Sequence, residues 1–295
     1  MSELTEKLQL RTYAKLNLML RINGINEIGY HDLFMVNQSL DLYDYLKFEK
    51  NDKQGIVLDD GTSIDPQKNF VYKSAKYISD NYTPINLNIY LKKNIPMFAG
   101  LGGGSADAAA TIFAINRLYK LNLSNKELID IAKNIGADVP FCIFGGSKIA
   151  EGVGEKLTDI NLDSYYYLLI KPNLGMSTKI AFKEYDERVG YTNNLSSIEN
   201  ILDLKDNKID IEFIKANFYN DFEKVMLESF SVLNKIKTSL YKCGADFAQM
   251  TGSGTTMFGI FHDKKTRNVA YYKLKNRYDN VYRCQSTDKG IKILS

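Results

Sequence analysis

The chain has 295 residues, of which 44% are hydrophobic and 25% are charged, a composition typical of globular proteins and unlike that of disordered or fibrous chains. At roughly 100–200 residues per domain, this length favours two domains. The 38 basic and 35 acidic side chains leave a net charge of +3, which excludes the strongly basic class of nucleic-acid-binding proteins. A small anionic substrate held by a few lysines is compatible with this charge.

Histidine and cysteine are too scarce for a zinc site. The chain has two histidines, His31 and His262, and three widely spaced cysteines, so neither a zinc site nor a disulfide framework is expected. No basic and apolar leader begins the sequence, and no apolar run approaches the ~18 residues of a membrane span. We therefore expect a cytoplasmic protein without membrane contact, whose chemistry depends on carboxylates, lysines and backbone groups.

Alternating apolar residues predict strands in the first half of the chain. They occur at residues 8–22, 43–49 and 85–91, and we interpret Asn23-Gly24 as a turn after the first of them. Residues 51–61 predict a hairpin or loop, and residues 69–80 a helix. Ser124 and Glu127 have the spacing of a capping box, which predicts a helix that ends near Gly136.

The second half predicts fewer elements. Turn-forming residues are frequent at 147–156, where we place the boundary between two lobes, residues 1–155 and 156–295. Residues 165–171, 247–250 and 257–261 predict strands, and residues 220–242 one long helix. The loop between the last two strands contains Gly252 and Gly254 and by itself indicates a plain hairpin. Residues 187–210 give no prediction.

A glycine-rich segment follows the strand predicted at 85–91 and leads into an alanine-rich helix. Four glycines stand within the five positions from Gly100 to Gly104. Core packing does not explain them, since glycine has no side chain to bury and loses the most entropy on folding. They expose backbone N–H groups, and a helix that begins near Ser105 adds the positive end of its dipole. The segment therefore predicts a phosphate-binding loop.

The glycine-rich segment does not match the better-known phosphate loops or a flexible linker. A Walker A loop requires Gly-Lys-Ser/Thr, which is absent, and Ser105 stands where a dinucleotide-binding loop requires glycine. The His-Arg-Asp and Asp-Phe-Gly motifs of protein kinases are also absent. A flexible linker would have Ser/Gly-rich flanks instead of a strand and a helix.

Asp138 is a candidate catalytic carboxylate. It follows the helix predicted to end near Gly136 and precedes Val139-Pro140, and Pro140 favours an extended backbone at Val139. Between a helix end and an extended apolar segment, this carboxylate would be partly removed from water. Judged from this segment alone, a catalytic Asp and a turn Asp that caps local amides are equally compatible.

Three separated segments resemble, in order, the signatures of the GHMP small-molecule kinases. They are residues 12–18, 96–110 and 251–254. Four further segments, at 14–17, 29–33, 136–140 and 150–155, resemble the members of this family that act on a cytidine-diphosphate-linked sugar alcohol. The resemblance extends from about Leu8 to Phe261.

The resemblance implies an α+β fold with two lobes and the active site between them. The N-terminal lobe would contain βαβ elements like those of ribosomal protein S5 together with the glycine loop, and the smaller C-terminal lobe would be an α/β sandwich. The implied reaction is ATP-dependent phosphorylation of the 2-hydroxyl of the cytidyl substrate, in the non-mevalonate route to isoprenoid precursors. Gly29-Tyr30-His31 and the position of Asp138 favour this acceptor over mevalonate, homoserine or a sugar. A non-catalytic nucleotide-binding regulator is the alternative outside enzymes, although such a protein would be expected to lose Lys15 or Asp138.

The same resemblance implies roles for individual residues. Lys15 and Asp138 would be the catalytic pair, in which Asp138 accepts the proton of the hydroxyl or orients that group, and Lys15 stabilises the developing charge. Mg²⁺ would be held by Ser105, by ATP and by water. The residues expected at ATP are Asn69, Lys93, Pro96, Met97, Phe98, Ala99, Gly100, Leu101, Gly102, Gly103, Gly104, Ser105 and Ala106. Those expected at the cytidyl substrate are Asn17, Tyr30, His31, Thr178 and Phe182.

Phe98 departs from the family pattern, which generally has a small residue at this position of the loop. Its ring is expected to cover the nucleotide or to narrow the entry. The small-molecule substrate would be the main partner, without nucleic acid or membrane, and the protein would be a monomer or a homodimer.

Overall fold

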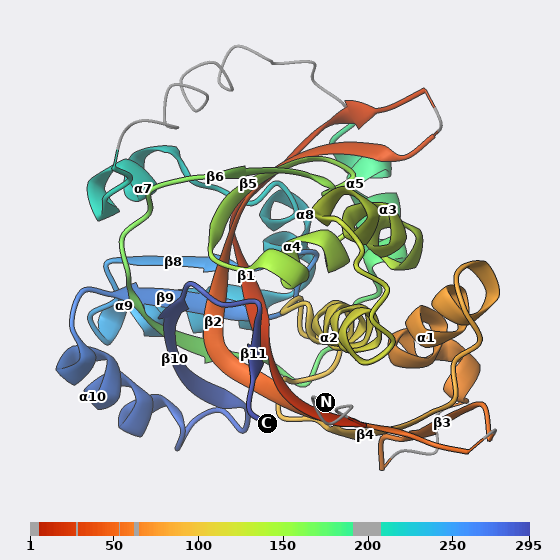
Figure 1. The fold of residues 1–295 in the computed structure, drawn as a ribbon. Helices are drawn as coiled ribbons and strands as arrows, with labels where there is room; N and C mark the ends of the chain where they lie inside the picture. Colours follow the sequence, from red (N-terminus) through yellow and green to blue (C-terminus); the bar gives the residue numbers. More distant parts are fainter. Residues whose placement is uncertain (1–5, 28, 53, 62–64, 191–207) are drawn as a thin grey trace.

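Two long strands form the centre of the fold. The computed structural model describes residues 6–27, 29–52, 54–61, 65–190 and 208–295. Strands β1 (Lys7–Ile25) and β2 (His31–Lys50) pair antiparallel from one end to the other and curve through the molecule (Figure 1). The predicted turn at Asn23-Gly24 is wrong: these residues lie inside β1 at a register shift, and the chain reverses between Asn26 and Tyr30. An Asn-Gly pair can be accommodated as a bulge where the flanking strands continue to pair.

Shorter strands extend this sheet along the edge of β2 that faces away from β1. Strand β4 (Leu87–Lys92) pairs with β2, and β3 (Ile56–Asp59) lies parallel to β4. Helix α1 (Phe70–Asn81) connects β3 to β4, so these elements form the expected βαβ unit. A strand within residues 51–61 therefore replaces the predicted hairpin or loop. Strands β5 (Ser147–Gly152) and β6 (Lys156–Asp159) form a hairpin beside the other end of β2.

Four helices of the first half cover one face of this sheet. They are α1, α2 (Gly103–Leu118), α3 (Asn125–Ile135) and α4 (Val139–Phe144) (Figure 1). Alanines in α2 are fully buried, and their small side chains let this helix pack closely between the strands and α1. The predicted capping box of Ser124 and Glu127 begins α3.

A second set of strands follows in the last third of the chain. Strand β7 (Tyr166–Ile170) pairs with β9 (Met257–Phe261) and with β10 (Val281–Thr287), and β8 (Phe247–Met250) pairs with β9. Strand β10 continues into a short pairing with β2, and β11 (Ile291–Ile293) pairs with β1. The C-terminal strands thus return to the first sheet. The division of the chain into two lobes, residues 1–155 and 156–295, stays a prediction.

The remaining helices accompany these strands. They are α5 (Thr178–Arg188), α7 (Ile211–Asn217), α8 (Glu223–Ser229), α9 (Ser231–Lys242) and α10 (Lys264–Leu274), whereas a 3-10 turn η1 (Pro66–Lys68) directly precedes α1. The predicted single helix over 220–242 is wrong, because Phe230 has an extended backbone (φ −131°, ψ 90°) that separates α8 from α9. Its apolar periodicity nevertheless marks core residues, since Met226, Leu233 and Ile236 are buried.

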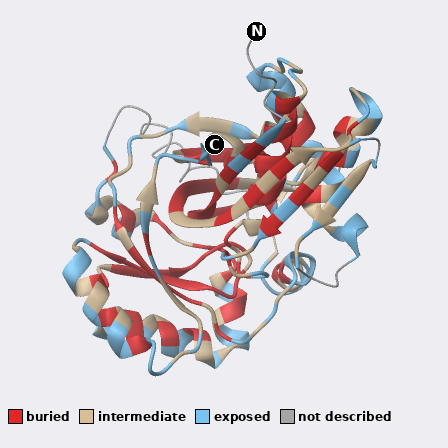
Figure 2. Cartoon of the chain, turned by 60° about the horizontal axis from the view of Figure 1, so that its bottom comes forward, coloured by how far each residue is buried: buried red, intermediate tan, exposed pale blue. Residues whose placement is uncertain are grey.

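Buried residues gather in two clusters. One lies between β1, β2, β4 and the helices α1 to α4 and extends onto one face of β7 and β9. The other lies on the opposite face of β7 and β9, together with β8 and the helices α5, α8, α9 and α10. Buried residues are red in Figure 2. Residues 147–152 form β5, and a turn at residues 153–155 leads into β6, so a strand occupies the first part of the stretch that the sequence marks as rich in turn-forming residues. Gly152 and Gly154 both have positive φ, which explains the turn signal in the sequence.

Gly145, which follows α4, provides a test of how closely the middle of the chain packs against its C-terminal part. Its backbone has φ 67° and ψ −157°, and a Cβ there would lie 2.0 Å from the backbone nitrogen of Gly290. We expect Gly145→Ala to lower the free energy of unfolding by about 3 kcal/mol or more, as measured by urea denaturation, because both strain and overlap oppose the side chain.

Gly175→Ala is the matched control. A Cβ on Gly175 meets no atom of the described residues within 4 Å, so its unfolding free energy should change by less than about 0.5 kcal/mol. Equal stability of the two variants would contradict the close packing of Gly145 against Gly290.

Candidate active site

The glycine loop lies between β4 and α2, in close contact with its neighbours. Gly100 and Gly102 have φ values of +71° and +66°. A Cβ on Gly102 would lie 2.8 Å from Cγ of Lys15, and a Cβ on Gly100 would lie 2.7 Å from the carbonyl oxygen of Thr251. The loop therefore requires glycine both for its conformation and for the close approach of two other segments.

The second glycine loop, Thr251 to Thr256, packs against the first. It joins β8 to β9 as the predicted hairpin, and it also holds β1, because the Thr251 hydroxyl accepts a hydrogen bond from the backbone N–H of Asn17 at 2.9 Å. The side-chain amide of Asn220 donates to the carbonyls of Met250 and Gly252, both at 2.8 Å. The loop is therefore part of the site, which the hairpin pattern alone did not show.

Lys15 and Asp138 meet at the glycine loop. Nζ of Lys15 lies 3.0 Å from Oδ2 of Asp138, and it donates to Oδ1 of Asn17 at 2.6 Å. The Lys15 side chain is 4% exposed and that of Asp138 is 28% exposed, so the carboxylate can reach a ligand while the amine is enclosed. The amide of Asn17 in turn donates to Oδ1 of Asn37 at 2.6 Å, and this chain of polar contacts fixes the position of the amine.

The segment after Asp138 is helical, so the predicted extended backbone at Val139 is wrong. Helix α4 begins at Val139, and Pro140 occupies its first turn, where the missing N–H of proline has no partner to lose. Asp138 directly precedes this helix, but among the described residues its side chain makes no capping hydrogen bond. The structure therefore does not support the alternative of a turn Asp that caps local amides.

A buried ionic cluster lies beneath the loop. Nζ of Lys93 contacts Oδ2 of Asp44 at 2.5 Å and Oδ2 of Asp107 at 2.6 Å. Oδ1 of Asp44 accepts hydrogen bonds from the backbone N–H groups of Asn94 and Ile95. Burial raises the pKa of Asp107 well above its usual range, although Lys93 lowers it. The cluster connects β2 to both ends of the loop, since Asn94 and Ile95 precede it and Asp107 lies in α2.

These groups line one cavity of about 670 Å³. Of the residues expected at the site, it is lined by Lys15, Asn17, Asn69, Lys93, Pro96 to Ser105, Asp138, Thr178 and Phe182. Phe98 is 76% exposed and belongs to the cavity wall.

Three expected residues lie outside this lining. Ala106 is fully buried and accepts a hydrogen bond from the Thr12 hydroxyl through its carbonyl, so it supports the loop from behind. Tyr30 is 63% exposed. His31 stacks on Phe182, with ring centroids 4.0 Å apart, and so adjoins the cavity through that ring.

The cavity also contains residues that were not among those expected at ATP or at the substrate. They include Phe70, Phe222, Gly252 and Ser253, of which the last two belong to the segment 251–254 that resembles a signature of the family. Phe222 was expected only as a core residue because of its apolar spacing, and it contacts Phe182 edge to face at 5.0 Å. The hydroxyls of Ser253 and Thr178 lie 3.1 Å apart, which links the second glycine loop to α5.

The described residues at the glycine loop offer few side chains that could bind a metal ion. In the part of the chain that the structure describes, no three His, Cys, Asp or Glu side chains group in a way that could hold a metal ion. Ser105 lies in the first turn of α2, in the cavity wall, and Oδ1 of Asp107 has no hydrogen-bond partner among the described residues.

Burial raises the pKa of the Cys142 thiol, so this cysteine, four residues after Asp138, stays protonated and is a poor nucleophile.

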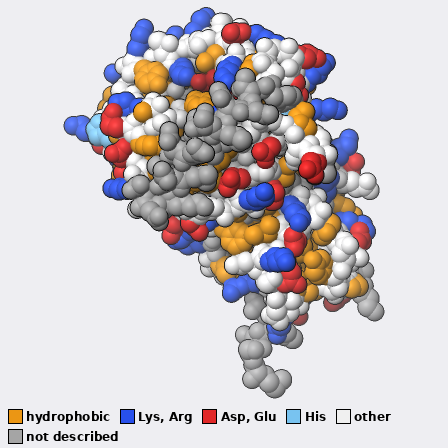
Figure 3. Space-filling view, turned by 90° about the horizontal axis from the view of Figure 1, so that it is seen from above, with side chains coloured by type: hydrophobic (Ala, Val, Ile, Leu, Met, Phe, Trp, Pro, Cys, Tyr) orange, Lys and Arg blue, Asp and Glu red, His pale blue; other side chains and the backbone are white. Residues whose placement is uncertain are grey.

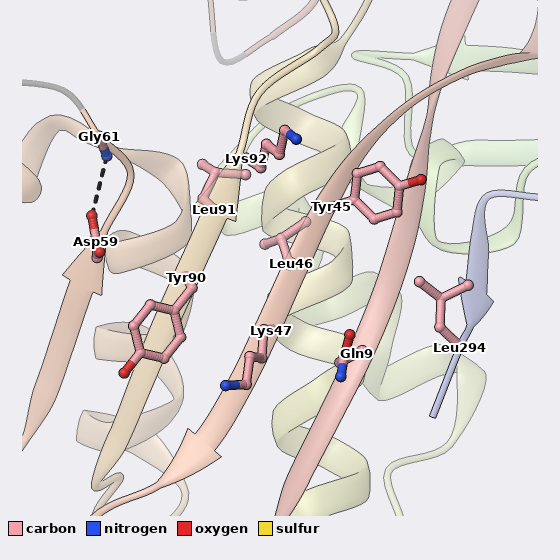
Figure 4. Close-up of a pocket in the computed structure, with 10 residues that line it drawn as sticks. All are labelled: Gln9, Tyr45, Leu46, Lys47, Asp59, Gly61, Tyr90, Leu91, Lys92 and Leu294. Atoms are coloured by element: carbon pink, nitrogen blue, oxygen red, sulfur yellow. Dashed lines mark hydrogen bonds between the residues drawn. The ribbon is translucent and has the colours of Figure 1, made fainter.

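A smaller hollow of about 300 Å³ lies on the exposed face of the first sheet (Figure 4). Its lining comes from neighbouring strands and includes Gln9, Tyr45, Lys47, Tyr90 and Lys92. Nζ of Lys47 lies 5.1 Å from the centre of the Tyr90 ring and also pairs with Glu49. These contacts stabilise a solvent-facing sheet, and none of the residues expected at the site is among them.

The surface shows no polyanion-binding area on the face seen in Figure 3, where basic and acidic side chains of the described residues are interspersed. This agrees with the balanced charge of the sequence. None of the described helices combines the length and hydropathy that crossing a membrane requires.

Comparisons with known proteins agree with this geometry. The family model of the GHMP kinases N terminal domain matches residues 69–146, and that of the GHMP kinases C terminal domain matches residues 198–280. A protein of Caldanaerobacter subterraneus subsp. tengcongensis named 4-diphosphocytidyl-2-C-methyl-D-erythritol kinase is 42% identical over 290 residues, which cover 98% of this chain and 100% of the relative. A protein of Clostridium tetani with the same name is 39% identical, over 93% of this chain and 98% of the relative. The chain belongs to the 4-diphosphocytidyl-2-C-methyl-D-erythritol kinase family of the GHMP kinases.

Solved structures support the same conclusion about this kinase. A crystal structure of 4-(cytidine 5'-diphospho)-2C-methyl-D-erythritol kinase superposes with a TM-score of 0.78 at 26% identity, over 95% of this chain and 99% of that one. A homoserine kinase from Cytophaga hutchinsonii superposes with a TM-score of 0.79 at 18% identity, over 100% and 99% of the two chains. The second likeness shows the fold alone. The enzyme thus has the α+β fold of the GHMP kinases and is a small-molecule kinase, as the resemblance implied.

Gly102 tests the contact between the loop and the lysine. In Gly102→Ala the new Cβ would push against Cγ of Lys15, and we expect kcat to fall by about 10- to 100-fold, because small displacements of reacting groups are costly. Steady-state kinetics of ADP release measures this effect.

Gly55→Ala serves as its control. Gly55 has a similar φ of +70° and its Cβ would meet no atom of the described residues within 4 Å, so it introduces the same backbone strain without touching Lys15. An equal loss of kcat in both variants would show that strain, and not displacement of Lys15, is responsible.

Proposed function

We propose that this enzyme transfers the γ-phosphoryl group of ATP to the 2-hydroxyl of 4-diphosphocytidyl-2-C-methyl-D-erythritol, in the non-mevalonate route to isoprenoid precursors. The observation that carries this proposal is the Lys15–Asp138 ion pair in the wall of the same cavity as the glycine loop. An anion-binding loop beside a partly exposed carboxylate is what phosphoryl transfer to an alcohol requires. The acceptor is the one that the names of the relatives give.

Asp138 acts on the acceptor hydroxyl. Its carboxylate receives the proton of the 2-hydroxyl as that oxygen attacks the γ-phosphorus, or it orients the hydroxyl for this attack. The ammonium of Lys15 contacts both Asp138 and Asn17, so it lies where negative charge develops on the transferred group. Orientation and charge stabilisation supply most of the rate when the transition state of phosphoryl transfer is loose.

The glycine loop binds the triphosphate of ATP. Backbone N–H groups of residues 100–105 and the N-terminus of α2 attract the phosphates. Asn69 and Lys93 lie in the same cavity wall, toward the adenosine. Lys93 is already paired with two carboxylates, so it also contributes by holding the loop in place.

The cytidyl end of the acceptor lies at α5 and the start of β2. Asn17 and Thr178 line the cavity near the methylerythritol and its phosphates, and Phe182 offers a ring for the base. His31 stacks on this ring, and the exposed Tyr30 directly precedes His31 in the chain. An aromatic face combined with a histidine edge can distinguish cytosine from other bases.

Mg²⁺ fits this site as an ion carried mainly by the nucleotide. The described part of the cavity offers the hydroxyl of Ser105 and no cluster of acidic ligands, which suits a cation that keeps waters and binds phosphate oxygens. The bound ion would neutralise charge on the transferred phosphates. Use of the enzyme in the cytoplasm, as a monomer or a homodimer, belongs to the same proposal.

A substrate panel separates the candidate acceptors. We expect ADP release with the cytidyl substrate and at most traces with mevalonate, homoserine or galactose, because only the cytidyl substrate uses the α5 end of the cavity. A coupled ADP assay on the purified enzyme measures this. Preferred phosphorylation of mevalonate or homoserine would overturn the choice of acceptor, and no ADP release with any acceptor would favour a non-catalytic nucleotide-binding protein.

Asp138→Asn tests the role of the carboxylate. We expect kcat to fall by ~10²–10⁴ while the affinity for ATP stays within a few-fold, because the glycine loop is untouched. Asp130→Asn is a matched control, since Asp130 lies on α3, is 47% exposed and pairs with the surface Lys133 in an i,i+3 contact. An unchanged kcat in Asp138→Asn would remove Asp138 from the mechanism.

A further inference from the structure

One face of α5 is directed at the substrate end of the cavity. Thr178, Phe182 and Asp186 follow one another at intervals of four residues, so they lie on the same side of this helix. Thr178 and Phe182 line the cavity, and Asp186 lies one turn further along. The adjoining face of α5 is buried through Ala181 and Tyr185, which are 0% and 2% exposed. The direction of the face is thus fixed by packing.

Asp186 contacts a residue from a distant part of the sequence. Its Oδ1 lies 3.0 Å from Nε2 of His31, at the start of β2. The His31 side chain is 17% exposed and that of Asp186 is 33% exposed, so the contact is partly shielded from water at the rim of the cavity. A carboxylate can only accept a hydrogen bond, and the proton of this contact must therefore be on Nε2 of His31.

The His31 ring is held on two sides. It stacks on Phe182 with centroids 4.0 Å apart and an angle of 18° between the planes, and Asp186 holds its Nε2 edge. Phe182 in turn contacts Phe222 edge to face at 5.0 Å, and both phenylalanines line the cavity. Stacking fixes the plane of the imidazole but permits a 180° flip about the Cβ–Cγ bond, which exchanges the two edges of the ring. The hydrogen bond from Nε2 to Asp186 selects one of these two orientations.

We propose that Asp186 is a positioning residue for the pyrimidine end of the acceptor, because it fixes the orientation and the tautomer of His31 beside Phe182. This inference rests on the proposed function, which places a cytidine diphosphate group at this end of the cavity. Asp186 acts through His31 and takes no part in phosphoryl transfer. It lies outside the motifs by which the sequence resembles its family.

The test compares two substitutions of Asp186 with a control on the same helix. Asp186→Ala removes the acceptor, whereas Asp186→Asn keeps an amide oxygen that can accept the same hydrogen bond. Glu187→Gln removes one carboxylate charge at the next position, where Glu187 is 60% exposed and lies 3.7 Å from Lys183. The readouts are kcat, the KM for each substrate, the melting temperature and the Kd for cytidine 5'-diphosphate measured by calorimetry.

We expect Asp186→Ala to raise the KM for the cytidyl substrate and the Kd for cytidine 5'-diphosphate by about 5- to 20-fold, the size of one hydrogen bond to a charged group. Its kcat and its KM for ATP should stay within about twofold, because the reacting groups are untouched. Asp186→Asn should restore binding to within about threefold of the wild type. Glu187→Gln should behave as the wild type, and all melting temperatures should agree within about 2 °C.

Each other outcome has a definite meaning. Unchanged binding in Asp186→Ala, an equal rise in the KM for ATP, a lower melting temperature, or an Asp186→Asn variant as impaired as Asp186→Ala would each overturn the positioning role. A wild-type enzyme that binds no cytidine 5'-diphosphate and does not phosphorylate the cytidyl substrate would overturn the proposed function, and this inference with it.

Discussion

The close approach of the glycine loop to β1 is the constraint on which the site depends. A side chain on Gly102 would overlap Lys15, and a side chain on Gly100 would overlap the backbone of the second glycine loop. Because no side chains intervene, three segments that are distant in the sequence meet at backbone distance. The backbone of Lys15 even donates a hydrogen bond to the carbonyl of Leu101 at 3.0 Å. The amine of Lys15 is thereby placed beside the loop that receives the phosphates.

Two ionic arrangements stabilise this meeting point from opposite sides. On the cavity side, Lys15 pairs with Asp138 and Asn17. Beneath the loop, Lys93 pairs with Asp44 and Asp107, and Asp44 also accepts the N–H groups at the start of the loop. Buried charges of this kind add little net stability but are strongly unfavourable when one partner is removed. They therefore specify one position of the loop relative to β1 and β2.

Local patterns predicted the parts of the site that are continuous in the sequence. The glycine loop, the helix after it and the capping box of Ser124 were predicted from spacing and composition, and the structure confirms them. Predictions failed where tertiary contacts outweigh local preference. Asn23-Gly24 is bridged by the long pairing of β1 with β2, Val139-Pro140 begins a helix, and Phe230 interrupts an apolar periodicity. The strands β10 and β11 near the end of the chain were not predicted, because their pairing with β2 and β1 depends on residues more than 200 positions away.

The sequence by itself predicted a phosphate-binding backbone segment, and its resemblance to the GHMP kinases pointed to Lys15 and Asp138. Its two histidines and three cysteines are too few for a zinc site or a disulfide framework. Such features depend on residue type and short spacing, which the sequence states directly. The tertiary structure decided which of these groups meet. It brought Lys15 to Asp138, packed the Thr251 loop against the first glycine loop, and placed Asp186 against His31. These contacts join positions more than 100 residues apart, and only the packing of the strands and helices between them sets such distances.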